Sequence, residues 1–596
     1  MDGMVELTMT TKWLKSGLVA VAFSSLTLIS AQAAAQSQSM AAHYGGEAER
    51  NDAIPRILSD SERAHYRQVF RAIDREQWDE VIALLEREKD SVLYQTALAE
   101  FYTHANSPKV NAEQIAAWFQ LGVHLPQSEQ MGRLGATRGL DSVPELPRVQ
   151  GFRSQPYAPK RIRPRSIVDG SMPNETRSAI LDRIKNDDPA GAHVLLAEID
   201  PGLSPQARAE WRQRVAWSYY IENNDEAALR LAETVSEGSG AWVAEGEWVA
   251  GLSAWRLGYC ALAGESFARA ASQSTNVELT AAAHYWAHRA LVRCREPGQA
   301  QEHLSAAARY DETLYGMLAA DQLGIEFPTS VTPEPFTSGD WRDLSGVYNV
   351  KIAAALVEIG RPGLADEVLR HQARVGDARD YEALSRLARE LGLPSTQLFM
   401  AHNAPYGMRS DGSLRFPVAR WQPRNGWRVD PALAFAHALQ ESNFRASAVS
   451  PANARGLLQI MPGTARDHNR SLNLGASYAD LNDPEVNLAY GQQHMEMLRD
   501  SPATEGKLPK IMAAYNAGLT PVTRWNYEIN DQNDPLLYME SIPYWETRGY
   551  VAIVMRNYWM YERAAGVPSP SRRALAQGLW PEFPEMGRSR AAYLVR

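Results

Sequence analysis

The sequence predicts a mainly α-helical protein of several domains, and three observations carry that prediction. The chain has 596 residues, which is too long for one core, so roughly two to four domains are expected. Apolar residues recur at helical spacing, as they do at Trp78, Val81 and Leu85. From residue 174 to 327 the pattern repeats about every 30 to 40 residues as pairs of helices, which is typical of a solenoid of helical hairpins.

The composition is that of a soluble globular protein and gives no sign of a nucleic-acid partner. Apolar residues make up 45% of the chain and charged residues 22%, and the net charge is −9. A nucleic-acid-binding chain would show a basic face, which this sequence lacks. It also lacks zinc-type Cys/His spacing, a P-loop and a GxGxxG unit. No metal, nucleotide or other cofactor is therefore expected.

The N-terminus has the pattern of an export signal. Two lysines precede an apolar run at 17–30, and Ala-Gln-Ala at 31–33 fits a small-x-small cleavage site. The run is shorter than the roughly 20 residues of a membrane span. The first cysteine is Cys260, so no cysteine near the cleavage site could carry a lipid. We expect a cleaved signal peptide at 1–35 and a soluble periplasmic protein, with an uncleaved signal anchor as the alternative.

A break in the helical pattern separates two helical stretches. Residues 140–173 contain several prolines and a basic cluster at 160–165. The cluster could contact an anionic polymer, but its composition favours a solvated surface linker.

The only two cysteines lie one predicted helical repeat apart. Cys260 and Cys294 are separated by 34 residues, which can bring them onto neighbouring helices. An oxidising compartment permits a disulfide between them, and two free buried thiols are the alternative.

One helix places a carboxylate in an unusual setting. Asp430 and Pro431 form a helix start, and residues 431–439 are apolar except for His437, so this helix should be buried. Glu441 follows at its C-terminal end. Burial and the negative end of the helix dipole both raise the pKa of a carboxyl group placed there. A carboxyl group that stays protonated near neutral pH can act as a general acid.

Separated motifs then follow in a fixed order. They are E-S-x-F at 441–444, A-x-S-P at 448–451, G-L-L-Q-I-M-P-G-T-A at 456–465, D-P-E-V-N-L-A-Y-G at 483–491, A-A-Y-N-A-G at 513–518 and E-S-I-P-Y-W-E-T-R-G-Y-V at 540–551. Together they resemble the catalytic domain of the soluble lytic transglycosylases, lysozyme-like enzymes that cleave bacterial peptidoglycan. Two departures, Leu458 for the usual Met and Asn453 for the usual Gly, leave the acid intact.

The resemblance implies a domain order. It predicts an N-terminal helical superhelix at 36–327, a small helical linker domain at 328–415 and a lysozyme-like domain at 416–565. Residues 566–596 show no clear period, and we expect a poorly ordered or surface-hugging tail there.

The resemblance also implies a chemistry and a set of residues. Glu441 would be the single general acid and base, and the sugar's own 6-hydroxyl would close a 1,6-anhydro ring on muramic acid. Ser450 and Gln459 would hydrogen-bond the substrate, and Met461 would pack on a sugar ring. The remaining substrate-binding candidates are Tyr515, Asn516 and Glu540, with Tyr515 a candidate hydrogen-bond partner of Glu441.

We therefore expect a monomer that binds the glycan strands of peptidoglycan. Cell-wall synthesis or secretion machinery is a further candidate partner. Two other functions stay open. A hydrolytic muramidase would need a second carboxylate aimed at water, for which Asp467 is the nearest candidate. A helical-repeat scaffold with an inactive lysozyme-like module would only bind peptidoglycan.

Overall fold

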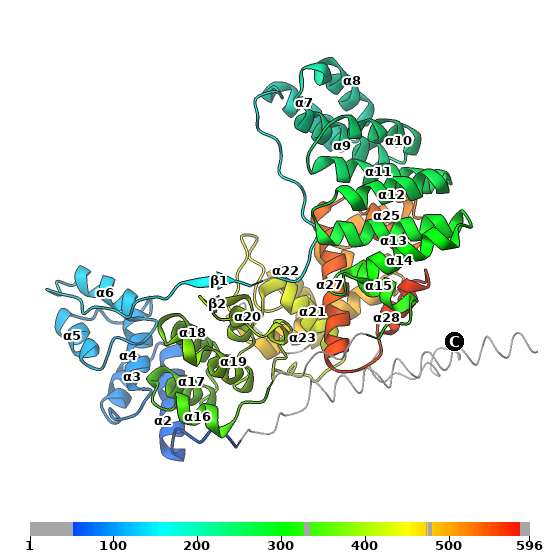
Figure 1. Ribbon diagram of the computed structural model, residues 1–596. Coiled ribbons are helices and arrows are strands. Elements are labelled where there is room, and N and C mark those ends of the chain that lie inside the picture. Colours follow the sequence, from blue (N-terminus) through cyan, green and yellow to red (C-terminus); the bar gives the residue numbers. More distant parts are fainter. Residues whose placement is uncertain (1–51, 156, 327–333, 473, 475–478, 585–596) are drawn as a thin grey trace, which may run out of the picture.

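The computed structural model describes residues 52–155, 157–326, 334–472, 474 and 479–584. The predicted signal peptide at 1–35 lies outside these ranges. Helices dominate the described residues, which confirms the predicted mainly α-helical fold, and the one sheet has two strands (Figure 1).

The first helices of the described part of the chain belong to an N-terminal unit that also contains much later residues. They are α2 (Asp60–Asp74), α3 (Trp78–Leu85), α4 (Tyr94–Thr103), α5 (Ala112–Gln120) and α6 (Ser128–Thr137). The later helices are α16 (Ser338–Leu344), α17 (Tyr348–Glu358), α18 (Pro362–Val375), η3 (Ala378–Asp380), α19 (Tyr381–Glu390) and α20 (Pro394–His402). Both groups bury their apolar faces in one core (Figure 1).

Polar contacts tie the two halves of this N-terminal unit together. Glu358 at the end of α17 accepts a hydrogen bond of 2.8 Å from the backbone N–H of Ile57, and the Asn349 amide donates to the carbonyl of His124 at 2.7 Å. Strand β1 (Phe152–Ser154) also pairs antiparallel with β2 (Asn403–Pro405). The predicted superhelical domain at 36–327 thus contributes to two separate cores, a division that helical periodicity did not predict.

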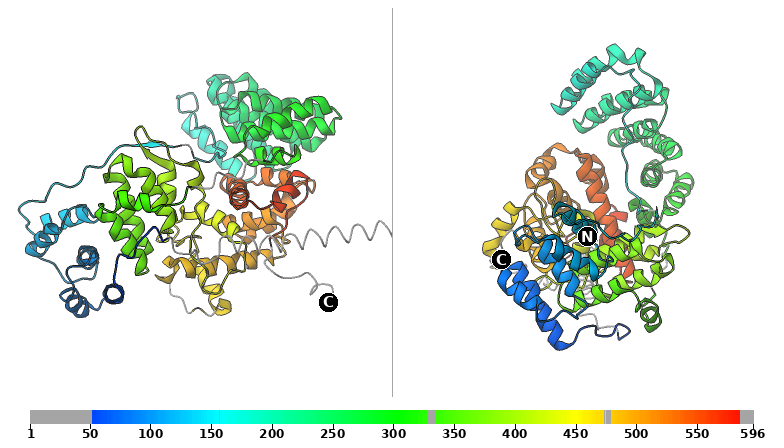
Figure 2. Two further views of the ribbon diagram at one scale, coloured as in Figure 1. Left: turned by 60° about the horizontal axis from the view of Figure 1, so that its bottom comes forward. Right: turned by 90° about the vertical axis from the view of Figure 1, so that its left-hand side faces the viewer.

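The superhelix proper runs from residue 174 to 326 as stacked helical pairs. They are α7 (Asn174–Lys185), α8 (Pro189–Ile199), η1 (Asp200–Gly202), α9 (Pro205–Ile221), α10 (Asp225–Glu233), η2 (Thr234–Glu237), α11 (Trp242–Leu257), α12 (Cys260–Gln273), α13 (Val277–Arg293), α14 (Pro297–Ala308) and α15 (Leu314–Gln322). The right-hand view of Figure 2 shows these helices stacked in an arc.

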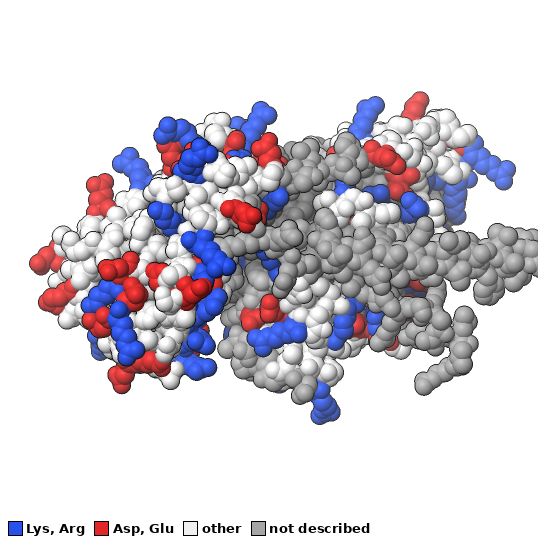
Figure 3. Space-filling model, turned by 90° about the horizontal axis from the view of Figure 1, so that it is seen from below, with Lys and Arg blue, Asp and Glu red and all other residues white. Residues whose placement is uncertain are grey.

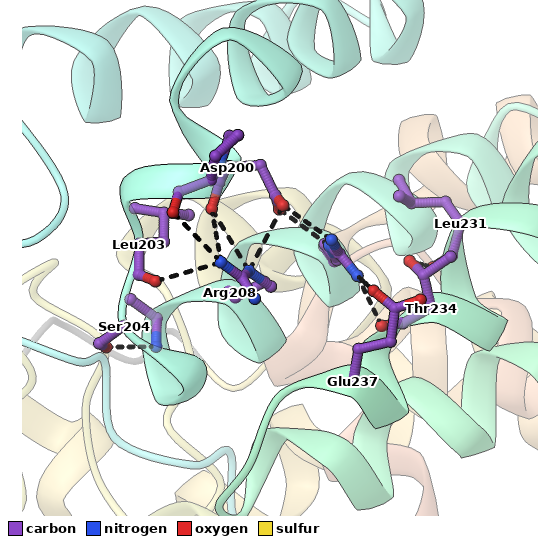
Figure 4. A network of polar contacts seen from close by, with 10 residues as sticks. Asp200, Leu203, Ser204, Arg208, Leu231, Thr234 and Glu237 are labelled. Carbon is purple, nitrogen blue, oxygen red and sulfur yellow. Dashed lines mark hydrogen bonds and ion pairs between the residues drawn. The ribbon is translucent and has the colours of Figure 1, made fainter.

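Two covalent or charged links hold successive helices of the superhelix. Cys260 at the start of α12 and Cys294 just after α13 form a disulfide, with their Cα atoms 5.6 Å apart. Arg212 of α9 donates two hydrogen bonds to Asp200 of η1, at 2.8 and 2.7 Å, and one to Glu237 of η2 at 2.6 Å. Figure 4 shows the polar network that contains Asp200, Arg208 and Glu237. Because Arg212 is mostly buried, these charged hydrogen bonds link α9 to η1 and η2.

A C-terminal unit follows from residue 412 to 584. It comprises η4 (Gly412–Arg415), α21 (Pro431–Ser442), α22 (Pro462–Leu472), η5 (Ala479–Asn482), α23 (Pro484–Arg499), α24 (Leu508–Ala517), α25 (Leu519–Glu528), α26 (Pro535–Ser541), α27 (Trp545–Ala564) and α28 (Pro570–Ala576). Its buried residues are continuous with those of the superhelix, so the two share one core.

Two expectations about surface segments need correction. We expected a poorly ordered or surface-hugging tail at 566–596, of which the structure describes residues up to 584. In that part, α28 packs on α15 and buries Leu575 completely. The sequence analysis did not predict α28 because only a short apolar face indicates this helix. The basic cluster at 160–165 was expected to be solvated, yet Arg161 is mostly buried against Glu245, with a shortest contact of 2.8 Å.

The described surface carries mixed charge. On the face seen in Figure 3, Lys and Arg side chains are interspersed with Asp and Glu. Within the described ranges, no helix combines the length and apolar character needed to cross a bilayer.

Candidate active site

Helix α21 carries the candidate acid, and its sequence explains its burial. The Asp430 side chain caps it by accepting a hydrogen bond of 2.9 Å from the N–H of Ala432, and Pro431 occupies the first turn. Residues 431–438 are all buried. The helix ends where Asn443 adopts a left-handed conformation, with φ at 51°. Glu441 therefore lies in the last turn of a helix enclosed by the rest of the unit.

Glu441 has the protonation behaviour that the sequence predicted. Burial raises the pKa of its carboxyl group to about 7. A hydrogen bond of 2.7 Å from the Tyr550 hydroxyl to Oε1 acts in the opposite direction, and the charge of Glu546 adds to the rise. A large fraction of Glu441 is thus protonated near neutral pH, and this partly exposed side chain can hand its proton on.

Behind Tyr550 lies His437, which is 1% exposed. Its Nδ1 is 2.7 Å from the Tyr550 oxygen. Burial lowers the pKa of His437 to about 3, so the ring is neutral. Because the Tyr550 hydrogen is donated to Glu441, Nδ1 must carry the ring hydrogen and donate to the Tyr550 oxygen. The chain His437, Tyr550, Glu441 then fixes Oε1 as an acceptor and leaves Oε2 to hold the acidic proton.

Helix α24 supplies two of the residues singled out in the sequence. Tyr515 lies parallel to Tyr550, with ring centroids 6.5 Å apart. Its hydroxyl donates a 2.8 Å hydrogen bond to the carbonyl of Leu458, not to Glu441 as expected from the resemblance. Asn516 accepts a hydrogen bond of 2.7 Å from Thr547 of α27. These contacts bind α24 to α27 and to the segment that carries Gln459.

The segment from 449 to 461 presents three further candidates. The Ser450 hydroxyl accepts a 3.0 Å hydrogen bond from the N–H of Ala454 and closes a turn. Gln459 has a φ of 47°, and its amide donates to the carbonyls of Ala448 and Gly456 at 3.2 and 2.8 Å. Both side chains therefore shape their own loop. Met461 is 42% exposed and free to meet a ligand.

Glu540 lies apart from the other candidate substrate-binding residues. It is 8% exposed, and its Oε1 accepts a hydrogen bond of 2.7 Å from Tyr315 of the superhelix. It lies at the seam between the superhelix and the C-terminal unit. The resemblance placed it further along a glycan groove. The E-S-I-P motif alone gave no sign of the partner helix α15.

Sequence reasoning missed Tyr550 as the hydrogen-bond partner of the acid. Tyr550 and Glu546 both lie in the E-S-I-P-Y-W-E-T-R-G-Y-V motif, and the structure connects each of them to Glu441. The signal that could have found Tyr550 is its place in one of the motifs that accompany the motif of the acid. Its partner could not be assigned because the two lie 109 residues apart.

Among the described residues, no group of three or more His, Cys, Asp or Glu side chains is placed to hold a metal ion. The candidate site is thus built from one carboxyl group, two tyrosines, a neutral histidine and amide-bearing loops.

Comparison with known proteins identifies this region. Residues 421–537 match the family model of the transglycosylase SLT domain. A putative soluble lytic murein transglycosylase of Haemophilus influenzae is 31% identical over 265 residues, which cover 42% of each chain. The soluble lytic murein transglycosylase of Escherichia coli K12 is 35% identical over 147 residues, 24% of this chain and 22% of that one. The matches thus span less than half the length of these relatives.

The likeness of fold extends much further than the likeness of sequence. The crystal structure of the 70 kDa soluble lytic transglycosylase of Escherichia coli matches 88% of this chain and 99% of that chain, with a TM-score of 0.53 at 18% identity. Residues 421–537 therefore match the transglycosylase SLT domain, within a chain that shares the fold of the 70 kDa Escherichia coli enzyme.

Proposed function

We propose that this protein is a lytic transglycosylase that cleaves the β-1,4 bond between N-acetylmuramic acid and N-acetylglucosamine and leaves 1,6-anhydromuramic ends. The single observation that carries the proposal is Glu441, a carboxyl group with a pKa of about 7 held by Tyr550 inside an SLT domain. The relatives named above are described as murein transglycosylases.

In the first step, protonated Glu441 gives its proton to the oxygen that links muramic acid to the next sugar. The bond from that oxygen to carbon 1 of the muramic ring breaks, and positive charge develops on the ring. Tyr550 supports this step because it engages Oε1 and leaves the proton on Oε2. The substrate's own N-acetyl group can assist at carbon 1.

In the second step, the Glu441 carboxylate takes the proton from the 6-hydroxyl of the same muramic ring. The 6-oxygen forms a bond to carbon 1 and closes the anhydro ring, so Glu441 ends the cycle protonated. An internal nucleophile needs no second carboxylate to activate water, because proximity supplies much of the rate. A pKa near 7 suits a group that must act first as acid and then as base.

The proposed substrate contacts come from the loops around Glu441. Ser450 and Gln459 would contact the sugar through polar groups, and Met461 through its exposed apolar side chain. Tyr515 and Asn516 of the neighbouring helix α24 complete the set. The N-terminal signal pattern supports a periplasmic location, where a monomer would meet glycan strands.

The test is mass spectrometry of purified peptidoglycan sacculi digested by the full-length protein. We expect anhydro ends, which are lighter than hydrolytic reducing ends by one water, roughly 18 Da, because the internal hydroxyl replaces the external nucleophile. Glu441→Gln should abolish the product, since an amide cannot give or take the proton. Glu485→Gln, on an exposed acid of α23, is the matched control and should keep full activity.

Each other outcome names a different function. Reducing ends would identify a hydrolytic muramidase, and no product from the wild-type protein would identify a peptidoglycan-binding scaffold. Retained turnover in Glu441→Gln would remove Glu441 from the acid role.

A further inference from the structure

A cavity of about 300 Å³ lies at the seam between the superhelix and the C-terminal unit. Helices α9, α11, α13 and α15 form one side of it, and α26 and the start of α27 form the other. Four indole rings line its walls, those of Trp217, Trp242, Trp248 and Trp545. Neither Glu441 nor Tyr550 is among its lining residues, so the cavity is distinct from the candidate active site.

Two arginines in its wall both lie near the ring of one tryptophan, Trp545. The guanidinium carbon of Arg163 is 5.7 Å from the centre of the Trp545 ring, and that of Arg548 is 5.0 Å from it. Arg548 also lies 4.1 Å over Trp217. Both guanidinium groups therefore contact the aromatic side chains that line this cavity.

Among the described residues, neither Arg163 nor Arg548 forms an ion pair. The hydrogen bond of Arg548 goes to the main-chain carbonyl of Glu540, at 3.1 Å. Arg161 provides the contrast, because Glu245 pairs with it at 2.8 Å. Burial lowers the pKa of Arg548 to about 10, and burial with the nearby charge of Arg214 lowers that of Arg163. The charges of Glu540 and Glu245 act in the opposite direction on the pKa of Arg548, and Arg163 is exposed. Because neither arginine has an ion-pair partner of its own in the described part of the chain, each can bind an anion.

The opposite wall offers groups that accept or donate hydrogen bonds. Glu278 is 8% exposed, and its Oε1 accepts a 2.9 Å hydrogen bond from the N–H of Leu314. Its Oε2 is buried and has no hydrogen-bond partner among the described residues. Both Glu278 and Glu540 line the cavity. Glu278 and Glu540 thus add polar groups to a wall that also carries apolar and aromatic side chains.

We propose that this cavity binds a small carboxylate whose body carries hydroxyl or amide groups. Arg163 and Arg548 hold the carboxylate, and the indole rings pack against the body. The volume is at the lower end of the range for small-molecule sites and suits a single sugar or a dipeptide.

Peptidoglycan offers two sources of such a carboxylate, and naming them rests on the proposed function. One is the lactyl group of N-acetylmuramic acid, and the other is the C-terminus of a stem peptide. N-acetylglucosamine is the matched probe for the first, because it has the same ring and N-acetyl group without the lactyl carboxylate. D-alanyl-D-alanine serves for the second.

The experiment is a titration of the full-length protein, followed by isothermal calorimetry and by tryptophan fluorescence. We expect saturable binding of N-acetylmuramic acid and at least tenfold weaker binding of N-acetylglucosamine. Arg163→Gln should weaken the binding at least tenfold. Arg177→Gln, on an exposed arginine of α7, is the matched control and should leave it unchanged. Arg548→Gln provides a second variant, and circular dichroism checks that each variant is folded.

The outcomes separate the sources and can overturn the proposal. Binding of the dipeptide alone, lost in Arg163→Gln, would keep the carboxylate site and assign it to the stem peptide. Equal binding of the two sugars with no binding of the dipeptide, no binding of any probe, or unchanged binding in folded Arg163→Gln would overturn it. Glu441→Gln should bind like the wild type, so failure of the seam site and failure of the proposed catalysis are distinguishable.

Discussion

At the scale of single residues, the acid depends on a partner that sits on another helix. Tyr550 donates to Oε1 of Glu441 and accepts from His437, so one hydroxyl group orients the carboxyl group and is itself oriented. Tyr550 also lowers the pKa of Glu441 against the larger effect of burial. The hydroxyl therefore sets both the geometry and the pH range of the acid.

Tyr550→Phe should slow the reaction and move the alkaline limb of its pH profile to higher pH. Glu441 must be protonated to act as the acid, so activity is present below its pKa and is lost as pH rises through about 7. Removing a hydrogen bond that lowers this pKa should shift the alkaline limb of kcat to higher pH. The maximal kcat should fall about 10- to 100-fold, because the carboxyl group is no longer positioned.

The matched control is Tyr527→Phe, on a tyrosine that is 88% exposed, and it should reproduce the wild-type profile. An alkaline limb that stays in place or moves to lower pH in Tyr550→Phe would contradict this role for Tyr550.

The sequence predicted the acid but not its partner, for a physical reason. The raised pKa of Glu441 follows from a buried helix, and burial is visible in the local pattern of residues 431–439. The Tyr550 contact depends on how α27 crosses α21, which no local pattern encodes. The same limit explains why Tyr515 was assigned to Glu441, although its hydroxyl binds the Leu458 carbonyl.

At the scale of elements, one glycine fixes the loop that carries Gln459. Gly456 has a φ of +75°, a conformation that favours glycine. Asn487 of α23 holds the same loop, since its side chain donates to the carbonyl of Arg455 at 2.9 Å and accepts from the N–H of Leu458 at 2.8 Å. The backbone of the loop therefore packs closely against α23.

Gly456→Ala should therefore disrupt the loop. The added Cβ would lie 2.2 Å from the carbonyl oxygen of Leu481 and 2.3 Å from the amide nitrogen of Asn487, so a rigid neighbour must shift. We expect a loss of roughly 2–4 kcal/mol in the free energy of unfolding, measured in urea, together with loss of turnover.

Gly463→Ala is the matched control, because the nearest atom to its Cβ is 4.0 Å away and the position lies in the first turn of α22. It should be neutral or slightly stabilising, since Ala favours a helix. Equal effects of the two substitutions would show that the space around Gly456 does not matter.

Helix-level prediction succeeded where the pattern was local. The helical pairs of the superhelix and the disulfide one repeat apart are both confirmed, because each depends on neighbouring helices. Prediction failed at α28 and at the segment around Arg161. In both places a short polar stretch is held by helices that are distant in sequence, so its composition resembles that of a solvated linker.

At the scale of the whole molecule, the superhelix and the C-terminal unit are joined through buried polar contacts. Ser541 at the end of α26 is 1% exposed. Its hydroxyl is 2.8 Å from the Tyr220 oxygen and 3.1 Å from Nη2 of Arg256, and both partners belong to the superhelix. Because the cores of the two units are continuous, this joint should make them unfold together.

Ser541→Ala is expected to weaken that coupling. It would leave the Tyr220 hydroxyl and an Arg256 N–H buried without their partner, which costs roughly 2–4 kcal/mol. Urea unfolding should then show a lower midpoint, and tryptophan fluorescence and circular dichroism should no longer change together. Ser236→Ala is the matched control, because that exposed hydroxyl bonds only within its own turn, to the carbonyl of Glu233 at 2.9 Å. If Ser541→Ala unfolds in one transition at the wild-type midpoint, the joint does not couple the two units, and the apolar core alone holds them together.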